Sequence, residues 1–117
     1  MDDLGRFAQM YLDGGVLDGV RLLTPETVAQ MTRNQIGRLE ERGLGWELNA
    51  DYYMGHLAGP TTYGHTGFTG TSLVIDPSRQ LIVVLLSNRV HPTRNGPSEN
   101  PARQVVADAA LAAVDRA

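Results

Sequence analysis

The chain has 117 residues with 42% apolar and 20% charged content, which predicts one globular domain with a modest core. Its formal net charge is −3, so it lacks the basic face of a nucleic-acid binder, and no apolar run approaches the roughly 18 residues of a membrane span. Cysteine and lysine are absent, which excludes disulfides, cysteine-ligated metals, thiol nucleophiles and every mechanism that needs a lysine base. We therefore expect no nucleic-acid partner and no membrane span.

The first 23 residues predict a helix followed by a small hairpin. Apolar residues recur at helical spacing from Leu4 to Leu12, with Asp2 or Asp3 as the cap and Gly14-Gly15 as the stop. Residues 16–23 then hold two short apolar stretches on either side of Asp18-Gly19. Such a pair of residues between apolar stretches favours a turn, so we expect two short strands here.

A second helix, a loop and a strand are expected next. Thr24-Pro25 begins the helix, because threonine caps and proline fits the first turn, and the helix should end near Arg33-Asn34. Residues 35–43 are polar and indicate a surface loop. Residues 43–48 (GLGWEL) predict a short strand, and residues 49–62 are rich in turn formers.

The last third of the chain predicts two further strands and a closing helix. Residues 63–75 read as one strand with a glycine-rich entry, and a turn at 76–79 follows it. Residues 81–86 (LIVVLL) form a continuous apolar run, which is typical of a strand buried on both faces. After a polar loop, Asn100-Pro101 begins a helix with a wide apolar stripe that extends to Ala113.

This order of elements predicts an α+β fold, with an antiparallel sheet of about three strands and helices packed on it. The strands within 71–86 must be antiparallel, because a turn of about five residues is too short for a parallel crossover. The apolar strand at 81–86 needs cover on both faces. We expect the last helix to supply one cover and the first two helices the other.

The unusual segment is Gly64–Gly70, with the sequence GHTGFTG. Three glycines in seven residues, at 64, 67 and 70, would let another group approach the backbone closely, and a histidine and two hydroxyls flank them. Free N–H groups at such a strand edge can hold an oxyanion. The alternative interpretation is a glycine-rich turn that feeds a hairpin, with His65 as an ordinary surface residue.

The wider sequence resembles the serine β-lactamase-like hydrolases: class C β-lactamases and the related esterases and D-alanyl-D-alanine peptidases. The resemblance covers nearly the whole chain, including its opening helical segment. It rests on separate pieces that occur in the same order, which are GLGWEL, YGHTGFTG, an aliphatic strand pair split by DPSRQ, LLSNR and the alanine-rich last helix. It implies a partial β-lactamase/transpeptidase-like fold, with 1–117 as a single unit from the C-terminal part of a larger hydrolase domain.

In that family the site is built from three motifs: Ser-x-x-Lys with the nucleophile, Tyr-x-Asn or a similar base motif, and Lys-Thr-Gly or His-Thr-Gly on a sheet strand. This sequence has the third motif alone, as His65-Thr66-Gly67, and the lack of lysine excludes Ser-x-x-Lys. The resemblance implies that Phe68 offers one oxyanion N–H and that His65 and Thr66 contact polar groups of the substrate. Histidine in place of lysine favours the esterase and peptidase branch.

Other candidate residues have ordinary explanations. His56, His65 and His91 lack metal-ligand spacing, and we expect no metal and no cofactor. Asp2-Asp3 and Glu40-Glu41 read as solvated faces, and Ser72 and Ser87 lie outside any nucleophile elbow. Trp46 reads as a core residue that could also line a groove beside His65. The polar residues after the third strand, Asn88, His91 and Arg94, could reach a substrate carboxylate or could simply belong to a polar loop.

Three functional hypotheses follow. In the first, the chain is the C-terminal portion of a serine hydrolase of small-molecule esters or amides and is inactive alone, because no catalytic nucleophile is present. In the second, it is a non-catalytic α+β module that binds a partner through its sheet edge. In the third, it is a small complete enzyme, for which no nucleophile or metal site is found. We expect the chain to associate, either as a homodimer or with a complementing N-terminal half.

Overall fold

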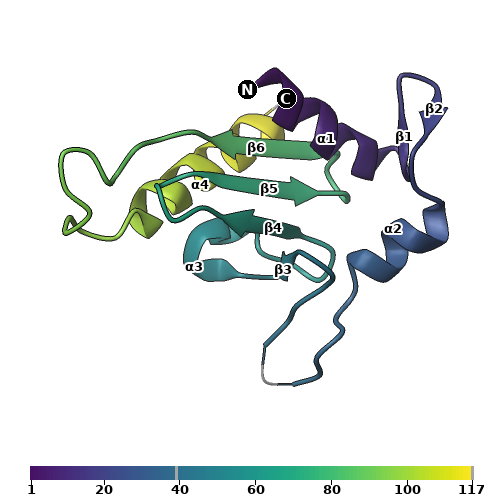
Figure 1. The fold of residues 1–117 in the computed structure, drawn as a ribbon, viewed down its shortest axis with the longest axis horizontal. Coiled ribbons are helices and arrows are strands. Elements are labelled where there is room, and N and C mark those ends of the chain that lie inside the picture. Colours follow the sequence, from purple (N-terminus) through teal and green to yellow (C-terminus); the bar gives the residue numbers. More distant parts are fainter. Residues whose placement is uncertain (39, 117) are drawn as a thin grey trace.

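The computed structural model describes residues 1–38 and 40–116 (Figure 1). Within them the helical elements are α1 (Asp2–Leu12), α2 (Pro25–Met31), α3 (Asp51–Met54), the 3-10 turn η1 (Gly55–Leu57) and α4 (Asn100–Asp115). The strands are β1 (Val16–Leu17), β2 (Val20–Arg21), β3 (Glu47–Leu48), β4 (Tyr63–Thr66), β5 (Ser72–Asp76) and β6 (Leu81–Leu85). β1 and β2 form a hairpin, and the other strands form one antiparallel sheet in the order β3-β4-β5-β6. The α+β class is confirmed, with four strands in the main sheet rather than about three.

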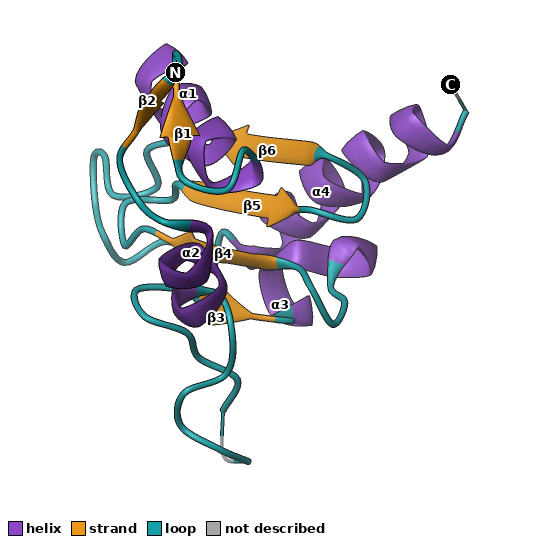
Figure 2. Ribbon diagram, turned by 90° about the vertical axis from the view of Figure 1, so that its right-hand side faces the viewer, coloured by secondary structure: helices purple, strands orange, loops and turns teal. Residues whose placement is uncertain are grey.

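The register of this sheet assigns each residue to one of two covered faces. Tyr63 lies opposite Ile75, and Gly64 lies opposite Val74. Because successive side chains of a strand point to opposite faces, Tyr63 and Ile75 face one layer of helices and Val74 faces the other. Figure 2 shows α3 and α4 together on one side of the strands, away from α1 and α2. β5 is therefore covered on both sides.

The face toward α1 and α2 is covered by an aromatic cluster. Tyr11 of α1 packs edge-on against Trp46 with ring centroids 5.0 Å apart, and Trp46 packs in the same way on Tyr63 at 5.2 Å. Ile75 of β5 and Val28 of α2 belong to the same buried cluster. Trp46 is thus a core residue, as the sequence indicates.

The other face is covered by α3, η1 and α4. Buried residues of α3 and η1 (Tyr53, Met54 and Leu57) join Ala107 of α4 over the strand residues Val74 and Val83. The backbone N–H of His56 donates to Asp108 Oδ1 at 2.7 Å, which fastens η1 to α4. Residues 49–62 therefore contain two short helical elements where the sequence predicts turns, because elements of three or four residues are too short to show a helical period.

Several turn and cap predictions are confirmed. Thr24 accepts a hydrogen bond from the Thr27 N–H at 3.1 Å, and Pro25 occupies the first turn of α2. Asp18 and Gly19 both have positive φ values, of 49° and 79°, which suits the two-residue turn between β1 and β2. α1 ends at Leu12, just before Gly14 and Gly15.

The structure also corrects some boundaries. Residues 63–75 do not form one strand, because the chain reverses at 67–71 and β4 pairs with β5 as a hairpin. In GLGWEL only Glu47 and Leu48 are strand residues, since 43–46 turn back on themselves. The cap position of α1 is Met1, so Asp2 and Asp3 lie in its first helical turn, where acidic groups suit the free N–H groups.

Two further expectations concern length and burial. α2 ends at Met31, two residues before Arg33. The strand of the apolar run is not buried on both faces along its length, because β6 lies at the edge of the sheet and Val83 alone among its residues is fully buried. Among the described residues, no helix combines the length and apolar character needed to cross a membrane.

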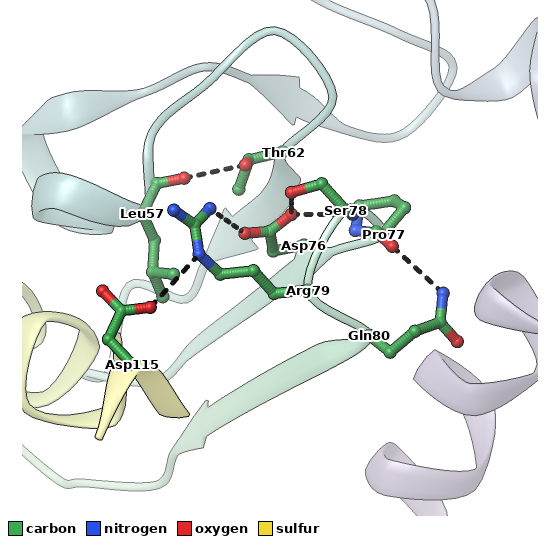
Figure 3. Close-up of polar contacts among 8 residues, drawn as sticks. All are labelled: Leu57, Thr62, Asp76, Pro77, Ser78, Arg79, Gln80 and Asp115. Atoms are coloured by element: carbon green, nitrogen blue, oxygen red, sulfur yellow. Dashed lines mark hydrogen bonds and ion pairs between the residues drawn. The ribbon is translucent and has the colours of Figure 1, made fainter. Parts of the chain in front are cut away.

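A buried carboxylate fixes the turn between β5 and β6 (Figure 3). Asp76 is 1% exposed, and its Oδ1 accepts from the Ser78 N–H at 2.9 Å and from the Ser78 hydroxyl at 2.6 Å. Its Oδ2 accepts from Arg79 Nη1 at 2.9 Å, and Arg79 Nε lies 3.9 Å from Asp115 at the end of α4. Burial raises the pKa of Asp76, but the hydrogen bonds from Ser78 and Arg79 outweigh it and hold that pKa below its ordinary value.

We expect Asp76→Asn to lower the free energy of unfolding by about 1–3 kcal/mol at pH 7, because buried donors lose a charged acceptor. A carboxyl whose pKa is lowered in the folded state stabilises the fold fully at pH values above its ordinary pKa of 3.8. That stabilisation is lost as the pH falls through the lowered pKa. The difference from wild type should therefore be full at pH 7 and shrink in acid. Urea unfolding at several pH values measures it. Asp115→Asn, at an exposed partner of Arg79, serves as control and should cost less than about 0.5 kcal/mol; equal stability of Asp76→Asn and wild type at pH 7 would contradict the prediction.

Candidate functional site

The glycine-rich turn, the loop 87–99 and the start of α4 meet at one end of the sheet (Figure 1). Between them lies a cavity of about 430 Å³. Its walls are Thr66, Gly67 and Phe68 from the end of β4 and its turn, Arg89, Ser98 and Glu99 from the loop 87–99, Asn100 and Arg103 from the first turn of α4, and Tyr52 of α3. Polar and charged groups from four segments therefore converge on a concave surface, which is the usual form of a binding site.

Glycine at positions 64 and 67 lets β4 and the turn after it pack closely on their neighbours. A Cβ at Gly64 would lie 2.2 Å from the Leu73 carbonyl oxygen and 2.8 Å from the Tyr53 hydroxyl. A Cβ at Gly67 would lie 2.1 Å from the Thr71 hydroxyl. The absence of these side chains lets the hairpin close, with Gly67 N–H donating to the Thr71 carbonyl at 2.8 Å and Gly70 N–H to the Gly67 carbonyl at 3.1 Å.

Arg103 of α4 holds this turn by a hydrogen bond to its backbone. The residue is 7% exposed, and its Nη2 donates to the Gly67 carbonyl oxygen at 2.9 Å. Its Nη1 donates to Asn100 Oδ1 at 2.6 Å, within the first turn of the same helix. Arg103 Nε is buried and has no hydrogen-bond partner among the described residues. The guanidinium therefore connects α4 to the turn, and its Nε–H remains an unused buried donor.

Phe68 lies exposed at the mouth of the cavity between two cations. Its side chain is 59% exposed, and the guanidinium carbons of Arg89 and Arg94 each lie 5.0 Å from its ring centroid. Arg89 Nε also donates to the Phe68 carbonyl oxygen at 2.9 Å, and Arg89 N–H donates to the Thr69 carbonyl at 2.9 Å. These cation–π and hydrogen-bond contacts hold the loop after β6 against the turn.

Tyr52 borders the cavity on the α3 side. Its hydroxyl donates to Glu47 Oε2 at 2.5 Å, and Glu47 Oε1 lies 3.2 Å from Arg42 Nη2. Burial is the largest influence on the pKa of Tyr52 and raises it, the hydrogen bond to Glu47 raises it further, and the Thr66 side chain opposes both. Tyr52 is therefore a protonated phenol at neutral pH.

The structure brings three of the four predicted site residues together. Thr66, Gly67 and Phe68 line the cavity, whereas His65 does not. His65 lies one position from Thr66 in β4 and so belongs to the opposite face, where its Nδ1 is 2.7 Å from the Thr66 carbonyl oxygen and its ring is exposed. No described residue accepts a hydrogen bond from the Phe68 N–H.

Sequence reasoning missed Tyr52 and Arg103. Arg103 carried a signal, because it lies four residues before Ala107 and hence on the buried face of a helix whose stripe is otherwise apolar. A charged residue on such a face needs a partner, and the partner here is 36 residues away in the chain. Tyr52 carried no such signal, since it stands in a segment without a clear period.

The remaining candidates do not form a second site. In 1–38 and 40–116 no three acidic, histidine or cysteine side chains are grouped closely enough to hold a metal ion. Ser72 is buried in β5, and Ser87 Oγ donates to the Gly70 carbonyl at 2.8 Å. Asn88 Oδ1 accepts from the N–H groups of Val90 and His91, which favours the loop interpretation for that residue.

Comparison with known proteins decides the family. The β-lactamase family model matches residues 1–108, which is most of the chain. The chain belongs to the β-lactamase family. This confirms the resemblance drawn from GLGWEL, YGHTGFTG and the pieces that follow them.

Its relatives within the β-lactamase family include two proteins described as putative D-alanyl-D-alanine carboxypeptidases, from Salmonella paratyphi B and Salmonella newport. Each is 42% identical over 103 residues, which covers 85% of this chain and 24% of the relative. The chain thus spans about a quarter of the length of these curated relatives. A crystal structure of a β-lactamase from Mycobacterium bovis superposes with a TM-score of 0.79 at 23% identity, covering 97% of this chain and 43% of that one. This similarity confirms a β-lactamase-like fold.

Replacing Arg103 should increase local opening of the turn at 67–71 in this β-lactamase-family chain more than it increases opening of the sheet. We expect Arg103→Met to speed hydrogen exchange of the Gly70 amide about tenfold or more, because a charge-assisted bond to its acceptor residue Gly67 is lost. Amide exchange followed by NMR measures this, with the amides of β5 as the internal reference. Arg6→Met is the control: it removes an exposed ion pair between Arg6 of α1 and Asp18, and it should change neither the exchange rate at Gly70 nor the rates in β5. Equal acceleration at Gly70 and in β5 would contradict a local role.

Proposed function

We propose that this chain supplies the substrate-binding side of a β-lactamase-like serine hydrolase and needs a nucleophile from elsewhere. Its role is to bind a small ester or amide beside Thr66–Phe68 and to offer a backbone N–H to the oxyanion that forms during acyl transfer. The main support for this proposal is the cavity at the end of β4, where Thr66, Gly67 and Phe68 meet the start of α4. The Phe68 N–H, which no described residue uses, supports its role as an oxyanion donor.

The nucleophile is the missing part of this proposal. Ser98 also lines the cavity, but its Oγ accepts a hydrogen bond from the Asn100 N–H at 3.2 Å, and the chain has no lysine that could activate it. An oxyanion hole with a binding site supplies only a residual part of the rate of such enzymes. We therefore propose that a segment with Ser-x-x-Lys completes the site.

His65 lies outside the cavity that Thr66 lines. Its ring is exposed at the same strand end but on the other face of β4, so it can contact a substrate only outside the cavity described above. Its role as a polar contact rests on the family motif. Thr66, Gly67 and Phe68 have the support of the cavity as well.

The isolated chain should be inactive. We expect no labelling by a fluorophosphonate serine probe and no hydrolysis of a p-nitrophenyl ester above the buffer rate, because a nucleophile without an activating base is weak. Mixing the chain with a separately expressed segment that carries Ser-x-x-Lys should produce labelling of that segment and turnover. Labelling of the chain alone that Ser98→Ala abolishes would contradict the proposal and favour a small complete enzyme.

A second proposal, association through the sheet edge, rests on β6. Within the described residues β6 pairs with β5 alone, so its other edge presents unpaired N–H and C=O groups. The strand carries no charge, which leaves that edge open to pairing with another strand. A complementing half of the hydrolase or a second copy of the chain could pair there, and a non-catalytic interaction module would use the same edge.

We expect the chain alone to self-associate, because no strand within residues 1–38 and 40–116 pairs with the outer edge of β6. Sedimentation equilibrium over a hundredfold concentration range should show a monomer–dimer equilibrium. Leu86→Lys adds a charge just beyond the end of β6, at a residue that is already exposed, and should weaken the association. A monomer at every concentration would refute self-association and leave the complementing half as the partner.

A further inference from the structure

A second cavity lies at the end of the sheet away from the turn at 67–71. Its volume is about 610 Å³, and it opens between the C-terminal end of α2, the start of β4 and Pro77 after β5. Figure 1 shows α2 beside this end of the sheet and the glycine-rich turn at the other end. Among the described residues, this cavity shares no wall residue with the one beside Thr66–Phe68. Its size is in the range of sites that hold small molecules.

Tyr63 brings an unused hydroxyl to this cavity. The residue starts β4, is 3% exposed, and packs its ring against Trp46 in the aromatic cluster. No described residue forms a hydrogen bond with the Tyr63 hydroxyl, and that oxygen is not one of the fully buried unpaired atoms, unlike the Tyr53 hydroxyl. It is therefore reached from the cavity that Tyr63 lines. Burial and the nearby Tyr11 raise the pKa of Tyr63, so the hydroxyl keeps its proton at neutral pH and can donate it.

Apolar side chains and two charged residues face the same cavity. The apolar wall residues besides Tyr63 are Ala29, Leu48, Pro60 and Pro77. Arg33, two residues beyond the end of α2, is exposed and takes part in no ion pair within 1–38 and 40–116. Glu41 is the other charged wall residue, and it is exposed as well. The neutral polar wall residues other than Tyr63 are exposed or half-buried, so water can serve them. Tyr63 is thus the one buried residue of this wall in the described part of the chain.

The depth of these groups decides which part of a ligand each one suits. Burying a charge costs far more than burying a neutral polar group, so the Tyr63 hydroxyl suits an uncharged acceptor such as a carbonyl oxygen. A carboxylate that pairs with the exposed Arg33 stays near water, and a guanidinium can hold it by two parallel hydrogen bonds. Glu41 repels a carboxylate, which favours the Arg33 side of the wall for the acid group.

We propose that this second cavity binds small carboxylic acids that carry a further, uncharged carbonyl group. Tyr63 donates a hydrogen bond to the carbonyl oxygen, Arg33 pairs with the carboxylate, and the apolar wall residues cover the hydrocarbon part of the ligand. The site binds its ligand without making or breaking a covalent bond. It lies outside the cavity of the proposed function, and neither proposal depends on the other.

A matched set of three ligands tests both contacts on the chain as it is. The compound β-benzoylpropionate has the carbonyl and the carboxylate, γ-phenylbutyrate has CH2 in place of the carbonyl, and β-benzoylpropionamide has a neutral amide in place of the carboxylate. Titrating each into ¹⁵N-labelled protein gives a dissociation constant and the set of amides that shift. We expect β-benzoylpropionate to bind about three- to tenfold more tightly than γ-phenylbutyrate and about two- to fivefold more tightly than the amide. The shifted amides should lie at 29–34 and 60–63.

Two variants with matched controls assign each contact to its residue. Tyr63→Phe removes a hydroxyl that has no partner among the described residues, so the fold should persist while the preference for the carbonyl disappears. Tyr53→Phe removes an unpartnered hydroxyl from the cluster on the other face of the sheet and should keep that preference. Arg33→Met should remove the preference for the carboxylate over the amide. Arg38→Met, at another exposed arginine but outside the cavity wall, should keep it.

The position of the shifted amides separates this site from the cavity of the proposed function. Shifts confined to 66–70 and 98–103 that Arg33→Met leaves unchanged would mean that the acid binds beside Arg103, which overturns the inference and leaves the proposed function untouched. Equal binding of all three ligands, no binding of β-benzoylpropionate to wild type, a carbonyl preference that survives Tyr63→Phe, or an equal loss of it in Tyr53→Phe each overturns the inference as well. Absence of turnover after a Ser-x-x-Lys segment is added overturns the proposed function alone, because the ratios measured here do not require hydrolysis.

Discussion

A buried guanidinium joins the two layers that make the cavity. Arg103 comes from α4, lies almost fully buried, and donates to the Gly67 carbonyl at the end of β4. A buried charge without partners costs several kcal/mol, so the position of this group is fixed by the oxygen atoms that it reaches. The cavity exists because α4 is docked on the sheet through Ala107, and that docking sets where Arg103 meets the turn. The packing of α4 on the sheet therefore also sets the shape of the cavity.

The double cover of β5 explains where polar groups can gather. With helices on both faces, the sheet has no open face, and its accessible backbone is limited to strand ends and to the edges at β3 and β6. The end of β4 is one such place, and the glycines there keep the backbone uncovered. Tyr52 and Arg89 then approach from α3 and from the loop after β6, so two further segments border the same cavity.

The predictable parts of the fold are those set by local chemistry. Thr24-Pro25 and Asp18-Gly19 fix a helix start and a turn by themselves, and the period of α1 needs no tertiary contact. The reversal after β4 escaped prediction, because a run that contains Thr, Phe, Val and Ile suits a continuous strand as well as a hairpin. Thr66–Phe68 were named from the family resemblance, while the face of His65 depends on the pairing of Tyr63 with Ile75, which no local pattern sets.

The strand order of the main sheet has a kinetic consequence. β3, β4, β5 and β6 are hydrogen-bonded in the order in which they occur in the chain; β4, β5 and β6 form two successive hairpins, and α3 and η1 stand in the connection from β3 to β4. Closing short loops costs little entropy and is fast, and proteins dominated by such local contacts fold more quickly than those that pair distant strands. The long-range steps that remain are the dockings of α1 and α4 on the finished strands. A nascent sheet can therefore form before either helical layer covers it, and for that interval its apolar faces are open to chaperones and to other unfolded chains.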